Sequence, residues 1–335
     1  MAERSTISQS VQIGVEATPG TAVAATRRLG SLGFSVGVQT EVSARRPIGQ
    51  KYASLQVLGK EWSEADLEGG PVYTELPYLF ASLLSEPTVT QVMGEGAVPT
   101  GAYRWVFDTS TFGEDNPTTF TLEQGSGARA HRLTNGIITD FDLSWGREEI
   151  EIGGTLLGRA IEDGITLTPN PTGLAQIPVK PTDLSVYLDS SAGTLGTTKL
   201  LRALSGEVSL GSRYAPLWVV DRDQPSFVTT IEGEPELEFT VVQMADQQGM
   251  ENLLALRGGA TRFLRLEAVG PVIFGSGAGA VRHSMAIDIA GQVSEVGEFS
   301  DEDGVYAVEW TFGGVHNPEW GKAMHVEVVT TTATL

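Results

Sequence analysis

The sequence predicts an all-β fold with minor α content, built as two tandem β modules that each carry one helix. The 335 residues include 40 glycines but only 22 lysines and arginines, a composition that favours strands and turns over long surface helices. Several segments alternate polar and apolar residues with the period of two that is typical of half-buried strands. The same order of elements, namely turn, strand, acidic strand, helix, strand and hairpin, occurs twice along the chain.

Each copy of this order begins with a turn and an alternating strand. Residues 15–38 run through a Pro-Gly turn and a stretch of small residues into such a strand, and residues 188–211 have the same order. Gly20-Thr21 in the first segment matches Gly193-Thr194 in the second, 173 positions later. We therefore expect the two segments to form equivalent parts of two modules.

One helix is predicted in each copy, after the acidic strand. Residues 74–84 begin with Thr74 as the expected N-cap and carry Pro77 in the first turns, where proline is tolerated. Residues 246–259 begin with Asp246 as the expected N-cap and end in a glycine pair. Both segments predict amphipathic helices that pack on the sheets.

A strand and a long hairpin close each copy. The strands are expected at residues 103–108 and 261–270, directly after the helices. The hairpins are expected at residues 138–154 and 293–314, where both arms alternate. A segment rich in proline and turn residues, 166–181, separates the two copies and predicts a linker.

The domain boundaries follow from these elements. They are an N-terminal arm at 1–14, a first module at 15–165, the linker at 166–181, a second module at 182–324 and a C-terminal tail at 325–335.

The acidic strands predict rows of carboxylates on one sheet face. EADLE at residues 64–68 is echoed by EPELE at residues 234–238, 170 positions later. Since side chains alternate between faces, Ala65 and Leu67 should face the core while the three acids next to them, Glu64, Asp66 and Glu68, face away. In the second copy the acidic row should begin at Glu232.

The hairpins repeat this choice of acids. A two-residue loop at 146–147 would place Asp142 opposite Glu151, and a two-residue loop at 303–304 would place Glu298 opposite Glu309. Like charges directly across a strand pair are destabilising, by about 0.2–1 kcal/mol. Solvated strand edges would explain these acids, but we favour a dedicated acidic β-surface. Its expected members are Glu64, Asp66, Glu68, Asp142, Glu151, Glu234, Glu236, Glu238, Glu298 and Glu309.

Composition excludes several classes of protein. Without cysteine, neither disulfides nor a thiolate metal site can form. No apolar run approaches the roughly 20 residues needed to span a bilayer, and the opening lacks the layout of a signal peptide. The net charge of −20 has the wrong sign for a nucleic-acid binder, since affinity comes from neutralising phosphates. An acidic host proteome, solubility, and a surface that must not hold a polyanion all remain open as explanations.

The sequence contains no catalytic constellation. Residues 33–37 match the pattern GxSxG, but they lie inside an alternating strand instead of at a strand-to-helix turn. The histidines have no paired-ligand spacing; they are His131, His283, His316 and His325. We therefore expect no enzyme activity, no catalytic residue, no cofactor and no metal.

The order of elements resembles the tail tube (major tail) proteins of long-tailed, siphovirus-type bacteriophages. The resemblance is carried by residues 11–29 and 59–84 in the first copy, and by residues 186–210, 227–239 and the predicted helix at Asp246 in the second. It implies two tandem β-sandwich tail-tube modules, each with one flanking helix. On oligomerisation their inner sheets would join into a continuous β-barrel, here as a homotrimer with pseudo-sixfold symmetry.

The resemblance also implies a function and partners. The chain would be a virion protein, assembled in the host cytoplasm, whose stacked rings form a tube that delivers DNA. Its partners would be other copies of itself, a tape-measure protein inside the tube, and tail terminator and distal tail proteins, with no membrane involved. An acidic lumen would let DNA pass without binding it. Residues 1–12, 87–134 and 325–335 are the expected contacts between rings.

A receptor- or carbohydrate-binding β-sandwich, such as an adhesin, is the alternative. Against it, Trp62, Trp105, Trp145 and Trp310 fall within expected strands, where packing in the core is the usual role of tryptophan.

Overall fold

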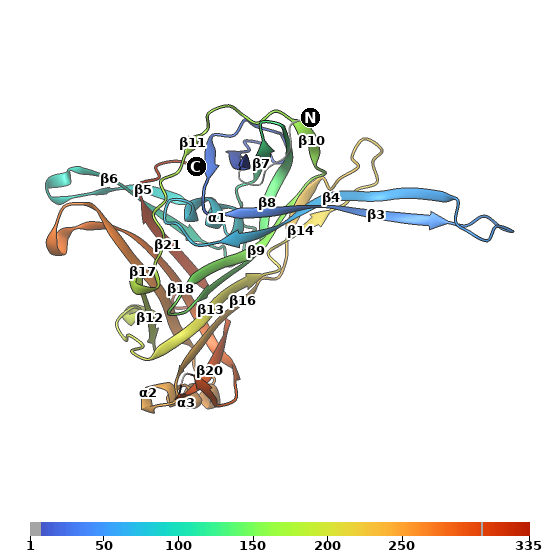
Figure 1. Cartoon of the computed structure of the whole chain (residues 1–335). Helices are drawn as coiled ribbons and strands as arrows, with labels where there is room; N and C mark the ends of the chain where they lie inside the picture. The colour runs from blue at the N-terminus through green and yellow to red at the C-terminus, as the bar shows by residue number, and fades with distance from the viewer. Residues whose placement is uncertain (1–7, 303) are drawn as a thin grey trace.

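The computed structural model describes residues 8–302 and 304–335, and it is all-β with minor α content, as predicted (Figure 1). The strands of the first half are β1 Ser10–Val15, β2 Arg27–Leu29, β3 Gly33–Arg45, β4 Leu55–Gly69, β5 Thr88–Met93, β6 Pro99–Asp108, β7 Phe120–Ser126, β8 Arg129–Trp145, β9 Ile150–Gly158 and β10 Glu162–Ile165. Those that follow are β11 Thr172–Gly173, β12 Leu184–Asp189, β13 Ala203–Gly211, β14 Tyr214–Leu217, β15 Thr229–Glu232, β16 Glu236–Met244, β17 Arg262–Phe274, β18 Val281–Val296, β19 Ser300–Glu302, β20 Val305–Gly314 and β21 Met324–Thr330.

Both predicted helices are present, with one difference at a cap. The first, α1 Leu76–Leu83, has proline in its first turn, but the Thr74 hydroxyl donates to the Ala175 carbonyl instead of capping the helix. All eight residues of α1 are buried, so it is a core helix and not an amphipathic one. The second forms as α2 Gln247–Met250 and α3 Asn252–Gly258, and the Asp246 carboxylate caps it by accepting from the Gly249 N–H at 2.9 Å.

The same strand connectivity occurs twice. In the first half β1 pairs with β7, β7 with β8, β8 with β9 and β10, β9 with β4, and β4 with β3. In the second half β12 pairs with β17, β17 with β18, β18 with β20 and β21, β20 with β16, and β16 with β13. The strand expected at 103–108 forms as β6, but β7 is the strand that occupies the place of β17. The β5–β6 hairpin is an addition to the first half.

The pairings correct the alignment between the two acidic strands. Leu157 of β9 pairs with Ile137 and with Glu64. In the second half Gly313 of β20 holds the same place, because it pairs with Gln292 and with Glu238. Glu64 therefore corresponds to Glu238, 174 positions later, so EADLE and EPELE are not equivalent stretches.

The first long hairpin is wider than predicted. Ser144 pairs with Glu151 and Asp142 with Gly153, which leaves a four-residue loop at 146–149. The expected two-residue loop, with Asp142 opposite Glu151, is wrong. Because the register differs by two residues, both carboxylates still lie on the same face of the sheet.

The second long hairpin has the predicted register only near its tip. Glu302 pairs with Val305, as expected for a loop at positions 303 and 304. Glu298, however, lies between β18 and β19, outside the paired strands, and the Gly297 N–H donates to the Glu309 carbonyl at 2.9 Å. The pairing pattern thus shifts before Glu298 reaches Glu309, and the expected pair of acids does not form.

One sheet runs through both halves. The C-terminal part of β8 pairs with β13, which gives the strand order β3-β4-β9-β8-β13-β16-β20-β18. A second link is made by β6, which pairs with β21. Large side chains such as Phe141, Phe239 and Trp310 lie on the inner side of this sheet, packed against α1 and the remaining strands, and are almost fully buried.

The linker and the tail are both packed against the body. Within the expected linker, β11 pairs in parallel with β2, and the Val179 N–H donates to the Pro71 carbonyl at 2.9 Å. The expected tail at 325–335 is largely β21, a strand between β18 and β6, so it is not a free tail. Of the expected N-terminal arm, residues 1–7 lie outside the described part, and β1 occupies the rest from Ser10.

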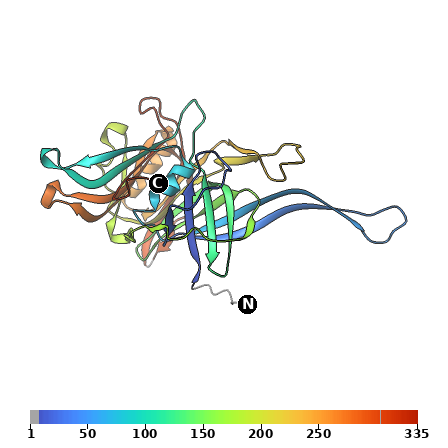
Figure 2. The ribbon, with the colours of Figure 1, turned by 90° about the horizontal axis from the view of Figure 1, so that it is seen from above.

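The molecule extends in two opposite directions from its body. The distal parts of β3 and β4 form a long arm on one side, and the β5–β6 and β17–β18 hairpins lie together on the other (Figure 2). We call residues 39–61 the β3–β4 arm. The expected loop at 87–134 therefore contains a hairpin and two further strands.

Candidate functional site: an acidic sheet face with two free edges

Acidic side chains form a regular row across the shared sheet. Read from β4 to β20, the cross-strand neighbours are Glu68, Gly153, Asp142, Ser209, Glu238 and Gly313. An acid thus stands on every second strand, with a small residue between. Since strands are about 4.8 Å apart, the acids of this row are spaced by about 10 Å, near the distance over which physiological salt screens charge.

A neighbouring row begins in the same way, with two acids separated by a serine, and ends in two threonines. It runs through Glu151, Ser144, Glu207, Thr240 and Thr311, which are cross-strand neighbours on β9, β8, β13, β16 and β20. Neither row contains a lysine or an arginine. The side chains between these positions along each strand, such as Leu143 and Val208, are buried, so both rows face away from the core.

The acids of this face influence one another. Partial burial, with the nearby Asp140 carboxylate, raises the pKa of Asp142 above its usual value. Partial burial also raises the pKa of Glu207, with further contributions from the Asp142, Glu238 and Glu309 carboxylates. Carboxylates from both halves of the chain therefore form one electrostatic surface.

Most of the ten predicted site residues lie on this face. Glu64, Asp66 and Glu68 project from β4, and the Glu64 carboxylate accepts from the Trp62 indole N–H at 2.9 Å. Asp142, Glu151, Glu236, Glu238 and Glu309 project from β8, β9, β16 and β20.

The remaining acids lie elsewhere, because the second acidic strand is broken. Glu234 lies in the connection between β15 and β16, and Glu298 lies in the connection between β18 and β19. Glu232 belongs to the small β14–β15 sheet and forms an ion pair with Arg213 at 2.8 Å, so it does not extend the row. Its neighbour Ile231, which alternation with Glu232 would place in the core, is exposed.

Sequence reasoning missed two members of the face and one large feature. Asp140 and Glu207 occupy the face on β8 and β13, and both stand in alternating stretches that would have indicated them. The large feature is the β3–β4 arm. Its segment 42–60 contains Arg45, Arg46, Lys51 and Lys60 but no acid, although the whole chain carries a net charge of −20.

The shared sheet ends in two unpaired strand edges among the described residues. β3 pairs only with β4, and residues 292–296 of β18 pair only with β20. Val38 on β3 is 53% exposed, whereas Leu210, its counterpart on β13, is 3% exposed because β8 covers it. An exposed apolar edge of this kind favours pairing with another strand.

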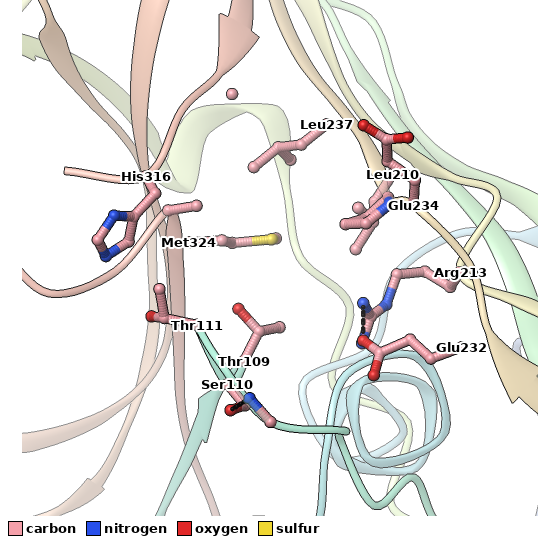
Figure 3. A pocket seen from close by; sticks show the side chains of 14 residues that line it. Thr109, Ser110, Thr111, Leu210, Arg213, Glu232, Glu234, Leu237, His316 and Met324 are labelled. Atoms are coloured by element: carbon pink, nitrogen blue, oxygen red, sulfur yellow. Dashed lines mark hydrogen bonds and ion pairs between the residues drawn. The ribbon is translucent and has the colours of Figure 1, made fainter. Parts of the chain in front are cut away.

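A pocket of about 430 Å3 lies where the two halves meet. Figure 3 shows Ser110 and Thr111 in the lower part of the view, Met324 and Leu237 above them, and Arg213 beside Glu232. The Ser110 hydroxyl accepts from the Gly113 N–H at 2.8 Å, and the His316 ring packs on Phe112. These interactions, within the described part of the chain, do not link Ser110 to His316.

Comparison with known proteins does not assign the chain to a family. No protein-family model matches the sequence, and no curated protein matches it. In the described part of the chain, no group of three or more histidine, aspartate and glutamate side chains is arranged to hold a metal ion. None of its helices combines the length and apolar character needed to cross a membrane.

Proposed function

We propose that the chain is a structural protein that assembles with copies of itself into stacked rings, forming a tube through which DNA passes, as in the phage tail tube proteins that its sequence resembles. One observation carries this proposal. The junction between β8 and β13 joins the two halves, and the corresponding strands at the ends of the sheet, β18 and β3, keep free edges. If β18 of one copy pairs with β3 of the next, the junction between copies repeats the junction between halves.

The register of this contact follows from the internal junction. Leu210 pairs with Phe141. The counterpart of Leu210 is Val38, and the counterpart of Phe141 is Val296, 155 positions later by the matching bulges of β8 and β18. Val38 of one copy should therefore lie opposite Val296 of the next, which would bury the exposed valine.

The repeated connectivity is compatible with the trimeric ring that the resemblance implies. Each copy supplies eight strands to the shared sheet, four from each half, so three copies would supply twenty-four. This exceeds the roughly 16–18 strands at which closed barrels already enclose an aqueous channel. A homotrimer with pseudo-sixfold symmetry is the assembly that this arrangement supports.

The acidic face would then line the channel. The opposite side of the sheet packs on the core of each copy, which leaves the two acidic rows for the lumen. Carboxylates repel phosphate groups and provide no counterion release, so DNA would pass this wall without being held. Attraction of DNA would instead require lysine or arginine, which both rows lack.

A disulfide between copies tests the predicted junction. The chain contains no cysteine, so Val38→Cys with Val296→Cys introduces the only thiols. Side chains directly opposite each other on antiparallel strands are close enough for a disulfide. Oxidation of the purified protein should give covalent trimers on a denaturing gel, and electron microscopy should show rings or tubes.

The matched control is Val38→Cys with Glu295→Cys, whose side chains should point to opposite faces of the shared sheet. Equal cross-linking of the two variants would exclude the predicted register. A monodisperse monomer in which neither variant cross-links would contradict the tube and favour a receptor-binding β-sandwich, for which binding to a glycan array is the decisive measurement.

A further inference from the structure

The two halves use the same hairpin in different conformations. By the pairings described above, β3–β4 corresponds to β13–β16, with Val36 in the place of Val208. In the first half the strands continue straight into the β3–β4 arm. In the second half β13 ends at Gly211, and the chain bends at Ser212, whose φ of 58° is unusual for a residue other than glycine. The chain then returns as the small β14–β15 hairpin.

Arg213, directly after this bend, lies buried beneath the first half. Its side chain is only 2% exposed. The guanidinium Nε donates to the Leu83 carbonyl at 3.1 Å, and Nη2 donates to the Leu84 carbonyl at 3.3 Å. These carbonyls end α1, where the helix dipole favours a positive charge.

Two carboxylates complete the surroundings of Arg213. Nη2 lies 2.7 Å from the Asp115 carboxylate, in the segment before β7, and Nη1 lies 2.8 Å from the Glu232 carboxylate at the end of β15. The Tyr214 hydroxyl also donates to the Leu84 carbonyl, at 2.9 Å. One guanidinium therefore connects the helix of the first half with the β14–β15 hairpin of the second.

The backbone and the apolar side chains of the β14–β15 hairpin also contact the first half. The Arg213 N–H donates to the Thr139 carbonyl at 3.1 Å. Phe227 from the hairpin is fully buried against Ile137 and Leu157 of the first half, with Trp218 packed on Trp62. The bend thus places an apolar surface where it covers β8 and β9.

The corresponding position of the first half differs in charge. The counterpart of Arg213, 172 positions earlier, is Glu41 on β3. Its carboxylate lies 3.6 Å from the Lys60 ammonium at the surface. A glutamate would be repelled by the carbonyl end of a helix, so this hairpin has no equivalent anchor.

We infer that Arg213 holds the β14–β15 hairpin folded against the first half, and that this anchor is why each copy presents one projecting arm instead of two. Arg213 acts within a single copy, so the hairpin is folded back whether or not the chain assembles. The inference therefore goes beyond the proposed tube and can be tested on the isolated protein.

Two spin labels measure the position of the hairpin. Ser35→Cys lies on β3 and Val220→Cys lies in the exposed connection between β14 and β15. Electron paramagnetic resonance should give one narrow distance distribution for the labelled protein. Removing Arg213 alone would leave two carboxylates buried without a cation, so the variant combines Arg213→Met, Asp115→Asn and Glu232→Gln. Its distribution should become broad and extend to longer distances.

Hydrogen exchange on Arg213→Lys provides the second measurement, in a protein that keeps the buried positive charge. Lysine cannot reach the two helix carbonyls and both carboxylates together. The amides of Tyr214, Ala215 and Leu217 should exchange at least about tenfold faster, while those of β17 and β18 remain unchanged. The matched control is Arg222→Met, on the same hairpin with a side chain that is 92% exposed, which should change neither measurement.

Unchanged exchange of Tyr214–Leu217 in Arg213→Lys would overturn the inference, even if the triple variant does not fold. A narrow distance distribution in a folded triple variant would overturn it equally. Neither result bears on the cross-linking of Val38 with Val296, so failure of this inference is distinguishable from failure of the proposed tube.

Discussion

Two carboxylates, Glu16 and Asp189, stand at the start of the loop that follows the first strand of each half. They stand 173 positions apart, the spacing that the Gly-Thr pairs of the sequence predict. The Glu16 carboxylate accepts from the Gly20 N–H at 2.6 Å, and the Asp189 carboxylate accepts from the Gly196 N–H at 2.9 Å. Each loop is therefore anchored by an acid at its start, although the bonded glycine lies four residues after Glu16 and seven residues after Asp189.

Asp189 should make stability depend on pH. Burial alone would raise its pKa, but hydrogen bonds from Thr198 and Thr197 outweigh burial and lower the pKa below the usual value. A carboxylate with a lowered pKa in the folded state adds stability above its unfolded pKa, and this stability is lost as the pH falls through the folded pKa. Asp189→Asn should therefore reduce the free energy of unfolding by about 1.5–3 kcal/mol at pH 7.

Urea unfolding at pH 7 and in acid measures this effect. The difference in unfolding free energy between the unsubstituted protein and Asp189→Asn should shrink as the pH falls below 3.8, the usual pKa of aspartate. Asp223→Asn, whose side chain is 80% exposed, is the matched control and should be neutral. A difference that persists undiminished in acid would show that the charge of Asp189 does not stabilise the turn.

At the scale of the strand, alternation in the sequence predicts the face of a residue but not its register. EADLE and EPELE are misaligned by four residues, and the Asp142 hairpin is offset by two. Both offsets are an even number of residues. Because side chains alternate between faces, every acid within a paired strand stayed on the predicted face. The register depends on bulges and loop lengths, such as the four-residue loop at 146–149, and no local pattern of apolar residues encodes these.

The prediction of faces fails where a strand ends. Gly233 and Pro235 interrupt the expected row between Glu232 and Glu236, since proline cannot donate to a ladder. The sequence also does not predict the β3–β4 arm, because no local pattern shows that its apolar residues lie outside the core. Val42, Tyr52 and Leu58 are each more than half exposed, although their types suggest burial.

Shortening the β3–β4 arm should separate ring formation from stacking. Replacing residues 42–59 with Asn-Gly places a two-residue turn between Glu41 and Lys60, which already pair across β3 and β4. The edge around Val38 remains, so trimeric rings should still form. The basic, apolar arm is lost, so we expect single rings instead of tubes in electron microscopy and sedimentation.

Almost all side chains of residues 42–59 are exposed, so the melting temperature should change little. Cross-linking of Val38→Cys with Val296→Cys in the shortened protein is the control for intact rings. Tubes of unchanged length would show that the arm does not connect rings, and would direct attention to the β5–β6 hairpin within the expected contact region 87–134.

At the scale of the whole molecule, the acidic face is one surface made by two halves. Glu68 and Asp142 belong to the first half and Glu238 belongs to the second, and the β8–β13 junction joins them into one row. The sequence predicts acids on each strand. It does not predict the alternation of acidic and small residues across strands, because that depends on how the two halves join. This spacing limits the repulsion that directly opposed acids would cause.

Reversing the charge of this surface should convert a passive wall into one that holds DNA. Asp142→Lys, Glu207→Lys and Glu238→Lys place cations from both rows on the proposed lumen. Tubes assembled with short duplex DNA should retain it in a nuclease-resistant form. The logarithm of the binding constant should fall linearly with the logarithm of salt concentration.

Exposed acids outside the shared sheet provide the matched control, with Glu95→Lys, Glu114→Lys and Glu319→Lys. DNA bound by the control tubes should remain sensitive to nuclease, because it is held outside. If the DNA on the lumen variant is equally sensitive, the acidic rows face outward and the wall of the channel is formed by another surface.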